Sequence, residues 1–324
     1  MPEAIESTKV NNKPMNFKGK DFIQLADFSK EEILHMLDVA VELKSLQKQG
    51  KPHPYLSGKV LGMIFEKSST RTRVSFEVGM LQLGGHAIFL SSKDIQLGRG
   101  ESIHDTAKVL SRYVDGIMIR TFGHETVEEL AEHASIPVIN GLTDLQHPTQ
   151  VLADLLTILE HKGKLEGVKM CYIGDGYNNM PHSLLEGAVK VGMDISIASP
   201  AGYLPDGNIT EQAIEAAKQT GVSVTITHDP VEAIKDADVV ITDVWTSMGM
   251  EAETEQRLKA FASYQVNEEL CKHAKDDYIF LHCLPAHRGE EVTAEVIDGS
   301  HSVVFDEAEN RLHAQKAILK LLLD

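Results

Sequence analysis

Two arginines and three hydroxyl side chains alternate in the segment Ser69-Thr70-Arg71-Thr72-Arg73. It follows an apolar run at 60–65 and opens a helical pattern at about 71–83. A polar turn between a strand and a helix aims hydroxyls, guanidinium groups and the free N–H groups of the helix N-terminus at one anion. A single arginine there is usually a solvated cap, whereas two arginines that alternate with hydroxyls favour a phosphate. The nucleotide-binding sequence Gly-x-x-x-x-Gly-Lys-Ser/Thr is absent, which counts against a nucleoside triphosphate.

Two further polar residues follow apolar runs in the first half of the chain. Arg120 closes the run 116–119, where a guanidinium either caps a strand edge or meets a ligand above the sheet. His147 precedes Pro148, and proline suits the first position of a helix. The helix dipole disfavours an imidazolium at that position, so we expect a neutral imidazole that donates one hydrogen bond. On local grounds alone, a surface histidine before a helix is an equally good interpretation.

The second half carries its own polar strand ends. The turn Gly174-Asp175-Gly176-Tyr177-Asn178-Asn179 resembles the dinucleotide-binding sequence Gly-x-Gly-x-x-Gly, but Asn179 replaces the third glycine. The asparagine pair suits hydrogen bonding to a small polar molecule instead. Asp243, with Ser247 nearby, suits an ammonium group, although an aspartate at a turn is often only a cap.

The segment His282-Cys283-Leu284-Pro285 follows the last apolar run of the second half. A lone cysteine is usually a small buried hydrophobic residue, yet Cys283 falls where a ligand crevice is expected. A zinc site formed by His282, Cys283 and His287 is the alternative, and it lacks a recognisable ligand spacing.

The elements that position these residues alternate as strands and helices. We predict strands at 60–65, 87–90, 116–119, 138–140, 168–173, 194–198, 222–227, 238–242 and 278–282. The predicted helices are 30–48, 71–83, 102–113, 125–134, 148–161, 182–191, 209–220, 230–235, 252–262 and 307–323. The alternation predicts an α/β fold of two domains, each a parallel sheet flanked by helices. Ligands bind beyond the carboxyl ends of such strands, which is where the polar residues above lie.

We place the first domain at 1–150 together with the C-terminal helix 307–324, and the second at 151–306. The helix 148–161 is the predicted bridge between them.

The composition excludes several classes of protein. The 324 residues carry a formal net charge of −17, which disfavours nucleic-acid or anionic-membrane binding. The three cysteines form no CxxC pair and no even-numbered disulfide set, which fits a reducing cytoplasm. No apolar run approaches the about 18 residues that span a bilayer, and the N-terminus has no secretory pattern. We therefore expect a soluble cytoplasmic protein.

Four motifs resemble the ornithine carbamoyltransferases. They are Ser-Thr-Arg-Thr-Arg at 69–73, His-Pro-Thr-Gln at 147–150, Asp-x-x-x-Ser-Met-Gly at 243–249 and His-Cys-Leu-Pro at 282–285. The first two are shared in kind across carbamoyltransferases, and the third points to ornithine. The resemblance runs from Phe22 to the segment Ala308–Arg311. It implies transfer of the carbamoyl group of carbamoyl phosphate to L-ornithine in arginine metabolism, giving citrulline and phosphate, by a homotrimer that needs no metal or organic cofactor.

The resemblance also implies roles for individual residues. Arg120, His147, Cys283 and Thr72 would be catalytic. Asp243 would hold the α-ammonium of ornithine, and Gln96 would reach the site of a neighbouring subunit. The carbamoyl phosphate set would be Ser69, Thr70, Arg71, Thr72, Gln96, Arg120, His147, Gln150, Cys283, Leu284 and Arg311. The ornithine set would be Asn179, Asp243, Ser247 and Met248.

Other functions remain open from the sequence. Putrescine carbamoylation is the principal alternative, but putrescine has no amino-acid head for Asp243 to bind. Aspartate would require cationic groups that the second half does not offer after its strands. An NAD-dependent dehydrogenase conflicts with Asn179 and with the lack of an acidic residue after the strand 194–198. A non-catalytic binder of phosphate or amino acid would show itself by forming no citrulline.

Overall fold

The computed structural model describes residues 15–96 and 100–324. The chain divides into two compact units: Met1–Leu156 with Glu309–Asp324, and Thr157–Ala308. Both boundaries fall inside helices, one in α5 (Pro148–Lys162) and the other in α12 (Val304–Leu323). The first unit therefore contains the end of the chain as well as its beginning.

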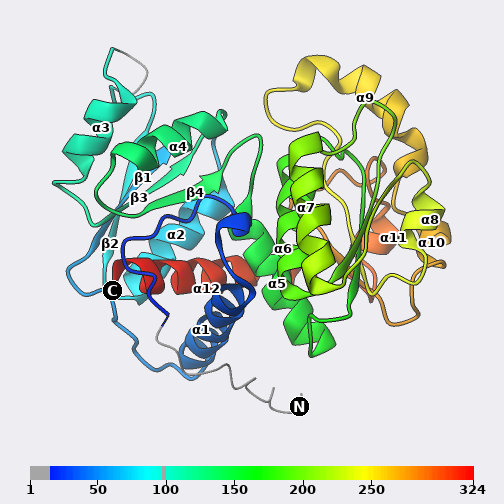
Figure 1. Ribbon diagram of the computed structural model, residues 1–324, viewed down its shortest axis with the longest axis horizontal. Coiled ribbons are helices and arrows are strands. Elements are labelled where there is room, and N and C mark those ends of the chain that lie inside the picture. Colours follow the sequence, from blue (N-terminus) through cyan, green and yellow to red (C-terminus); the bar gives the residue numbers. More distant parts are fainter. Residues whose placement is uncertain (1–14, 97–99) are drawn as a thin grey trace. The chain divides into compact units, whose positions relative to one another are not determined.

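The first unit is built on a four-stranded parallel sheet in the order β2-β1-β3-β4. Its strands are β1 (Val60–Phe65), β2 (His86–Ser91), β3 (Gly116–Arg120) and β4 (Val138–Leu142). Its helices are α1 (Lys30–Lys48), α2 (Thr70–Gln82), α3 (Ile103–Leu110) and α4 (His124–His133), with the later part of α12. Figure 1 shows α3 and α4 over one face of this sheet, and α1, α2 and α12 over the other.

Burial of apolar side chains on both faces holds this sheet between its helices. On one face, Ile64, Ile117 and Ile119 of the strands pack with Val127 and Leu130 of α4. Each of these side chains is fully buried, and a fully buried aliphatic side chain contributes about 1.5–3 kcal/mol. The strands thus present only their carboxyl ends to ligands.

The second unit has a five-stranded parallel sheet in the order β7-β6-β5-β8-β9. Its strands are β5 (Lys169–Ile173), β6 (Asp194–Ala198), β7 (Val224–Thr227), β8 (Val239–Ile241) and β9 (Ile279–Leu281). Its helices are α6 (Asn179–Val191), α7 (Gly207–Thr220), α8 (Pro230–Ile234), α9 (Thr254–Phe261), α10 (Glu268–Cys271) and α11 (Ala294–Ile297). The chain crosses from β7 at one edge back past β6 and β5 to β8, so the turns after β5 and β8 lie side by side at the carboxyl ends of neighbouring strands.

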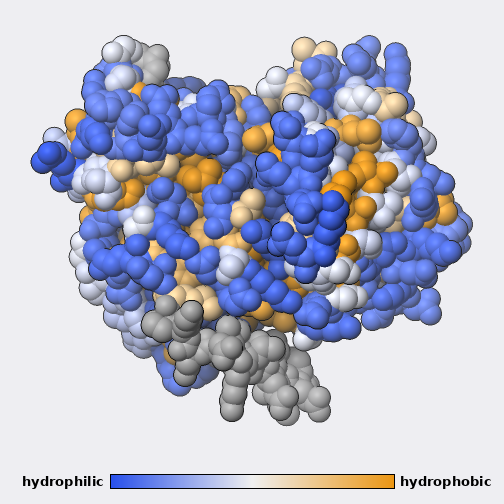
Figure 2. All heavy atoms as spheres, in the orientation of Figure 1, coloured by the Kyte–Doolittle hydropathy of each residue, from blue (hydrophilic) through white to orange (hydrophobic). Residues whose placement is uncertain are grey.

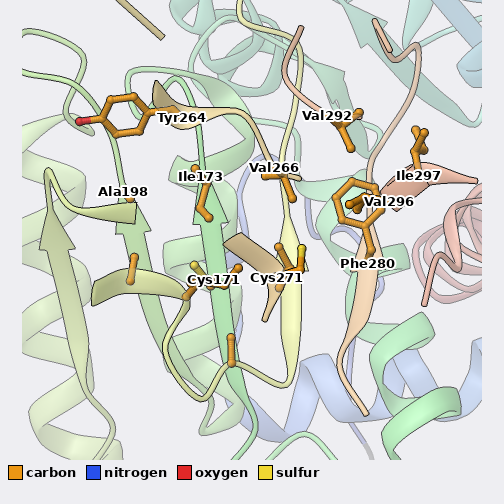
Figure 3. Packing of buried hydrophobic residues seen from close by; sticks show 14 of the residues in the cluster. Cys171, Ile173, Ala198, Tyr264, Val266, Cys271, Phe280, Val292, Val296 and Ile297 are labelled. Carbon is orange, nitrogen blue, oxygen red and sulfur yellow. The ribbon is translucent and has the colours of Figure 1, made fainter. Parts of the chain in front are cut away.

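A single hydrophobic cluster fills one side of this second sheet (Figure 3). Cys171 of β5 and Cys271 of α10 both point into it, beside Phe280 and Ile297. Burial raises the pKa of the Cys171 thiol to about 12. These two cysteines are therefore inert core residues, and Cys283 is the partly exposed thiol.

The predicted strands and helices are present, with boundaries that move by a few residues. The largest shifts, of three residues each, are in α3, which ends at Leu110 rather than 113, in α6, which begins at Asn179 rather than 182, and in α12, which begins at Val304 rather than 307. α6 begins earlier than predicted because the Asn178 side chain caps it and Pro181 is tolerated in a first turn. The short helices α10 and α11 were missed because one turn carries no periodic pattern.

The surface agrees with the polar composition. The face seen in Figure 2 is largely hydrophilic, with hydrophobic atoms in limited patches. Among the described residues, no helix is both long enough and apolar enough to cross a bilayer.

Candidate active site

The turn after β1 forms the first part of a site in the first unit. Ser69 caps α2, since its hydroxyl accepts a hydrogen bond from the Thr72 backbone N–H at 3.1 Å. Thr72 is fully buried, and its own hydroxyl accepts a hydrogen bond of 2.7 Å from the Arg311 guanidinium of α12. The structure thus joins two predicted site residues that lie 239 positions apart in the chain.

Arg73 does not belong to this site, although the predicted phosphate-binding segment included it. Its guanidinium pairs with Glu77 at 3.1 Å and lies over the Phe89 ring, 3.8 Å from the ring centroid. Side chains two positions apart on a helix point about 200° from one another, so Arg71 and Arg73 cannot serve one ligand from the same helix face.

Arg120 ends β3 at an irregular point of the sheet. The pairing between β3 and β4 shifts there, so that Ile119 is opposite Asn140 while Arg120 is opposite Leu142. Such bulges re-aim the side chain that follows them. Arg120 is only 5% exposed, and its backbone carbonyl accepts the Glu66 N–H at 2.9 Å, which ties the end of β3 to the turn after β1.

His147 lies at the start of α5 and is 4% exposed. Burial lowers the pKa of its imidazole well below the ordinary value, and the charges of Arg311, Arg120 and Arg71 lower it further. The prediction of a neutral imidazole is thus confirmed in direction, but the main causes are desolvation and three arginines rather than the helix dipole. A neutral histidine surrounded by three guanidinium groups is an arrangement built for a polyanionic ligand with a carbonyl to polarise.

Gln150 lies one turn into α5 and is fully buried. Its amide nitrogen donates to the Asp154 carboxylate at 2.9 Å. This hydrogen bond fixes the orientation of the side-chain amide, with its nitrogen toward Asp154. The Gln150 carbonyl oxygen is thereby oriented as an acceptor for an N–H group.

One ion pair and one hydrogen bond that the sequence reasoning missed hold these loops together. Lys67 forms an ion pair with Asp144 and lies 4.4 Å from the Phe122 ring centroid. Glu66 accepts a hydrogen bond from the Thr121 hydroxyl. These contacts join the loops after β1, β3 and β4. Lys67 and Asp144 both stand beside the motifs that were singled out, but nothing local shows that they pair.

Gln96 is exposed and directly precedes residues 97–99, the part of its predicted loop (91–100) that falls outside the described residues. Thr70 is also exposed, at the first turn of α2. Within the part of the chain that the structure describes, neither side chain forms a hydrogen bond or ion pair with another predicted site residue.

Asp243 and Cys283 form the centre of a site in the second unit. The Asp243 carboxylate accepts hydrogen bonds from the Cys283 thiol at 3.2 Å and from the Val244 N–H at 2.8 Å. Burial raises the pKa of Asp243, while His282 and these hydrogen bonds oppose the rise. A buried carboxylate in this state gains strongly from a cationic ligand, so an ammonium group fits it well.

Both nitrogens of the His282 ring form hydrogen bonds within the protein. Its Nδ1 accepts the Leu284 N–H at 2.9 Å, so the proton lies on Nε2, which donates to Glu291 at 3.0 Å. Leu284 has a positive φ of 58°, and this hydrogen bond stabilises that backbone conformation. The segment that carries Cys283 is thereby fixed from both sides.

The loop after β8 is tied to the turn after β5. The Asn178 side-chain amide donates to the Ser247 hydroxyl at 3.1 Å. The predicted site residue here was Asn179, and the structure shows that its neighbour makes the loop contact. Met248 is 48% exposed, beyond this contact.

Arg257 of α9 braces the same two segments and was not predicted. Its guanidinium donates to the Asp175 carboxylate at 2.6 Å and to the Trp245 carbonyl at 3.0 Å, and its Nε donates to Glu253 at 2.9 Å. Arg257 is only 5% exposed. The turn after β5 and the loop that carries Ser247 are therefore held by one buried cation.

Among the described residues, two groups of side chains could hold a metal ion, and neither is the zinc triad that the sequence offered as an alternative. Asp243, His282 and Cys283 form one group, while His287 belongs to the other, with Glu290 and Glu291. In the first group, both ring nitrogens of His282 are engaged within the protein, which leaves no imidazole lone pair for an ion. The zinc alternative therefore does not fit these residues.

Comparisons with known proteins match almost the whole chain. Residues 20–160 match the family model "Aspartate/ornithine carbamoyltransferase, carbamoyl-P binding domain", and residues 166–322 match "Aspartate/ornithine carbamoyltransferase, Asp/Orn binding domain". An ornithine carbamoyltransferase of Carboxydothermus hydrogenoformans is 63% identical over 95% of this chain and 99% of its own. One of Bacillus subtilis is 65% identical over 94% of both chains. The solved structure of ornithine carbamoyltransferase from Pyrococcus furiosus, 57% identical, superimposes with a TM-score of 0.93 over 95% of this chain and 98% of its own.

Proposed function

The chain belongs to the aspartate/ornithine carbamoyltransferase family, and we propose that it transfers the carbamoyl group of carbamoyl phosphate to the δ-amine of L-ornithine. The products are L-citrulline and phosphate, and the enzyme is a transferase of arginine metabolism. The observation that carries the proposal is the grouping of Arg71, Arg120 and Arg311 around a neutral His147. The relatives described above are named for ornithine and not for putrescine.

In this proposal the first unit binds carbamoyl phosphate. The Ser69–Thr72 turn, Arg71 and Arg311 hold the phosphate. Arg120, His147 and the Thr72 hydroxyl stabilise the oxyanion that develops on the carbonyl, and one such fixed donor is typically worth about 3–4 kcal/mol. A neutral imidazole suits this role because it donates a hydrogen bond without adding a further positive charge beside the guanidinium groups. Gln150 accepts from the carbamoyl NH₂ group.

The second unit binds ornithine. Asp243 pairs with the α-ammonium group, and the loop with Ser247 and Met248 holds the amino-acid head. Cys283 and Leu284 line the position of the reacting amine. The Cys283 thiol donates to Asp243, so the carboxylate is oriented before the substrate arrives.

The chemical step forms a bond between the δ-nitrogen and the carbonyl carbon, breaks the bond from that carbon to the phosphate oxygen, and releases one proton from the nitrogen. The δ-amine has an ordinary pKa near ~10, as lysine does, and it must be neutral to attack. Desolvation and nearby guanidinium charges favour the neutral form. No metal or organic cofactor enters this scheme.

We also propose a homotrimer that works in the cytoplasm. β2 is an edge strand of the first sheet, and it exposes Ile88 while the neighbouring α2 exposes Val74 and Leu81, at 48–64%. Apolar side chains on an exposed edge favour contact with another copy of the chain. The three cysteines, all of them among the described residues, are not joined by disulfides, which suits a reducing compartment.

An amine panel tests the reaction. The purified enzyme is incubated with carbamoyl phosphate and either ornithine, putrescine or aspartate, and the carbamoylated products are measured. We expect citrulline to form at least a hundredfold faster than the other products. A preference for putrescine, or no citrulline, contradicts the proposal. Arg71→Ala should weaken carbamoyl phosphate binding far more than binding of an ornithine analogue, and equal losses would contradict its assigned role.

A further inference from the structure

A buried lysine in the C-terminal helix has no part in the scheme above. Lys316 of α12 is fully buried, and its ammonium group contacts Gln47 of α1 at 3.1 Å, Gln82 of α2 at 2.8 Å and His53 Nε2 at 2.8 Å. Three elements of the first unit thus meet on one cation. Across residues 15–96 and 100–324, no carboxylate forms an ion pair with it.

All three acceptors are electrically neutral. His53 Nδ1 lies 2.8 Å from the Lys51 carbonyl, which can only accept, so Nδ1 carries the proton and Nε2 accepts from Lys316. Burying an ammonium group among neutral partners is costly, and a methionine of similar volume would avoid that cost. Such groups are best attested where they fix the register of packed elements.

The stem of Lys316 lies next to Gly79 of α2. A Cβ placed on Gly79 would lie 3.3 Å from Lys316 Cγ, and 3.7 Å from the side chains of Leu312 and Leu319. Thr72 lies seven residues before Gly79, on the same face of α2. There it accepts the 2.7 Å hydrogen bond from Arg311. The same pair of helices therefore carries both the lysine contact and the arginine of the phosphate site.

We propose that Lys316 is a positioning residue that sets the register of α12 against α1 and α2, and so places the Arg311 guanidinium for carbamoyl phosphate. This inference rests on the function proposed above for the first unit. A slip of α12 by one residue would move Arg311 by about 1.5 Å along the axis. Misplacements of about 1 Å in a positioned group reduce catalysis by up to about a hundredfold.

The principal experiment compares Lys316→Met and Lys316→Arg with Lys320→Met. Lys320 is one turn further along α12, over the Tyr55 ring, and is partly exposed, so it is a matched control. Binding of carbamoyl phosphate alone is measured by calorimetry, and KM for ornithine by citrulline formation. We expect Lys316→Met to raise the Kd for carbamoyl phosphate at least about tenfold while KM for ornithine changes less than about twofold. Lys316→Arg should recover part of the affinity, and Lys320→Met should match the wild type.

A double-mutant cycle with Arg311→Met tests whether Lys316 acts through Arg311. If it does, Lys316→Met causes no further loss of affinity in the Arg311→Met background. Additive losses, equal losses of both substrates, or a Lys316→Met variant that binds like Lys320→Met would each overturn the proposal. A wild-type enzyme that does not bind carbamoyl phosphate would instead refute the proposed function of the unit.

Gly79→Ala provides a variant that keeps the lysine, in case Lys316→Met does not fold. The added methyl group would lie 3.3 Å from Lys316 Cγ, so the lysine side chain or α12 must shift by a few tenths of an ångström, while alanine favours the helix itself. We expect the Kd for carbamoyl phosphate to rise severalfold without loss of folded protein. An unchanged Kd in this variant would also overturn the proposal.

Discussion

Replacing Arg257 with methionine should destabilise the second unit by about 3 kcal/mol at pH 7, and the loss should grow as the pH rises. Arg257 is the buried partner of the Asp175 carboxylate, which has no exposed surface. Burial raises the pKa of Asp175 from 3.8 to about 6 even with the arginine present. The variant leaves this carboxylate without its cation.

Protonation limits the loss. At 1.36 kcal/mol per pH unit, holding Asp175 ionised in the wild type already costs about 3 kcal/mol, whereas protonating it at pH 7 costs about 4.4 kcal/mol relative to its unfolded value of 3.8. The variant can always take the second route, so the carboxylate adds only about 1.4 kcal/mol. Loss of the hydrogen bond to the buried Trp245 carbonyl adds about 1–2 kcal/mol.

The sign of the pH dependence follows from proton counts. In the variant, folded Asp175 is protonated and the unfolded residue is ionised above pH 4, so the folded state binds one more proton. Its stability then falls by about 1.4 kcal/mol per pH unit as the pH rises above about 4, and it parts from the wild type above about pH 6. The wild type is ionised in both states above about pH 6 and contributes no such slope. The difference between the two proteins should therefore be smaller at pH 6 than at pH 8.

The assay is urea unfolding followed by the fluorescence of Trp245, the only tryptophan of the chain, which stacks on Phe261 inside the second unit. Arg288→Met is the matched control, since Arg288 pairs with Asp298 at the surface, where an ion pair contributes little to stability. Adding Asp175→Asn to Arg257→Met should abolish the pH slope. A loss that is independent of pH, or as large in the control, would refute this account of the pair.

Three shorter predictions concern the other titratable groups. Because burial and three arginines depress the pKa of His147, the affinity for carbamoyl phosphate should show no titration step near pH 6.5. His147→Gln should lower kcat about 10²–10³-fold. A titration step in the wild type that disappears in this variant would contradict a neutral imidazole. Asp243→Asn should raise KM for ornithine about a hundredfold, because the variant loses a buried ion pair with the α-ammonium group. The Kd for carbamoyl phosphate should stay within about twofold of the wild-type value. Similar losses of affinity for the two substrates would be inconsistent with the role of Asp243. Burial lowers the pKa of Lys316 to about 8, so above pH 8 the unfolded protein binds more protons than the folded protein. The free energy of unfolding of the wild type should therefore rise relative to that of Lys316→Met by up to about 3 kcal/mol at pH 10. Parallel curves of stability against pH for the two proteins would argue against a depressed pKa.

Sequence patterns were sufficient for the sheets because parallel strands are short, buried runs bounded by turns. The rule that ligands lie beyond the carboxyl ends of strands then located Arg120, His147 and Asp243 without any family knowledge. The same rule could not separate Arg71 from Arg73, which differ only in the helix face from which they project. At about 100° per residue around a helix, Arg73 projects from nearly the opposite face to Arg71, and this count would have excluded Arg73 from the predicted phosphate site.

Contacts between distant segments could not be predicted. Arg311 comes from the last helix and meets Thr72 across 239 positions, and only the family resemblance indicated it. Arg257 meets Asp175 across 82 positions and Lys67 meets Asp144 across 77, in pairs that no local pattern marks. These contacts depend on tertiary packing. A single sequence determines that packing, but no local pattern of residues shows which distant side chains will meet.

The last helix gives the first unit an unusual relation to protein synthesis. Its sheet is complete once Leu142 has been made, but α12 follows about 160 residues later, at Val304–Leu323. At roughly 5–20 residues per second, the emerging chain must wait several seconds or more before that helix can cover Gly79 and deliver Arg311. We expect the second unit to fold first during translation, and the ability to hold phosphate to arise only after α12 has emerged from the ribosome.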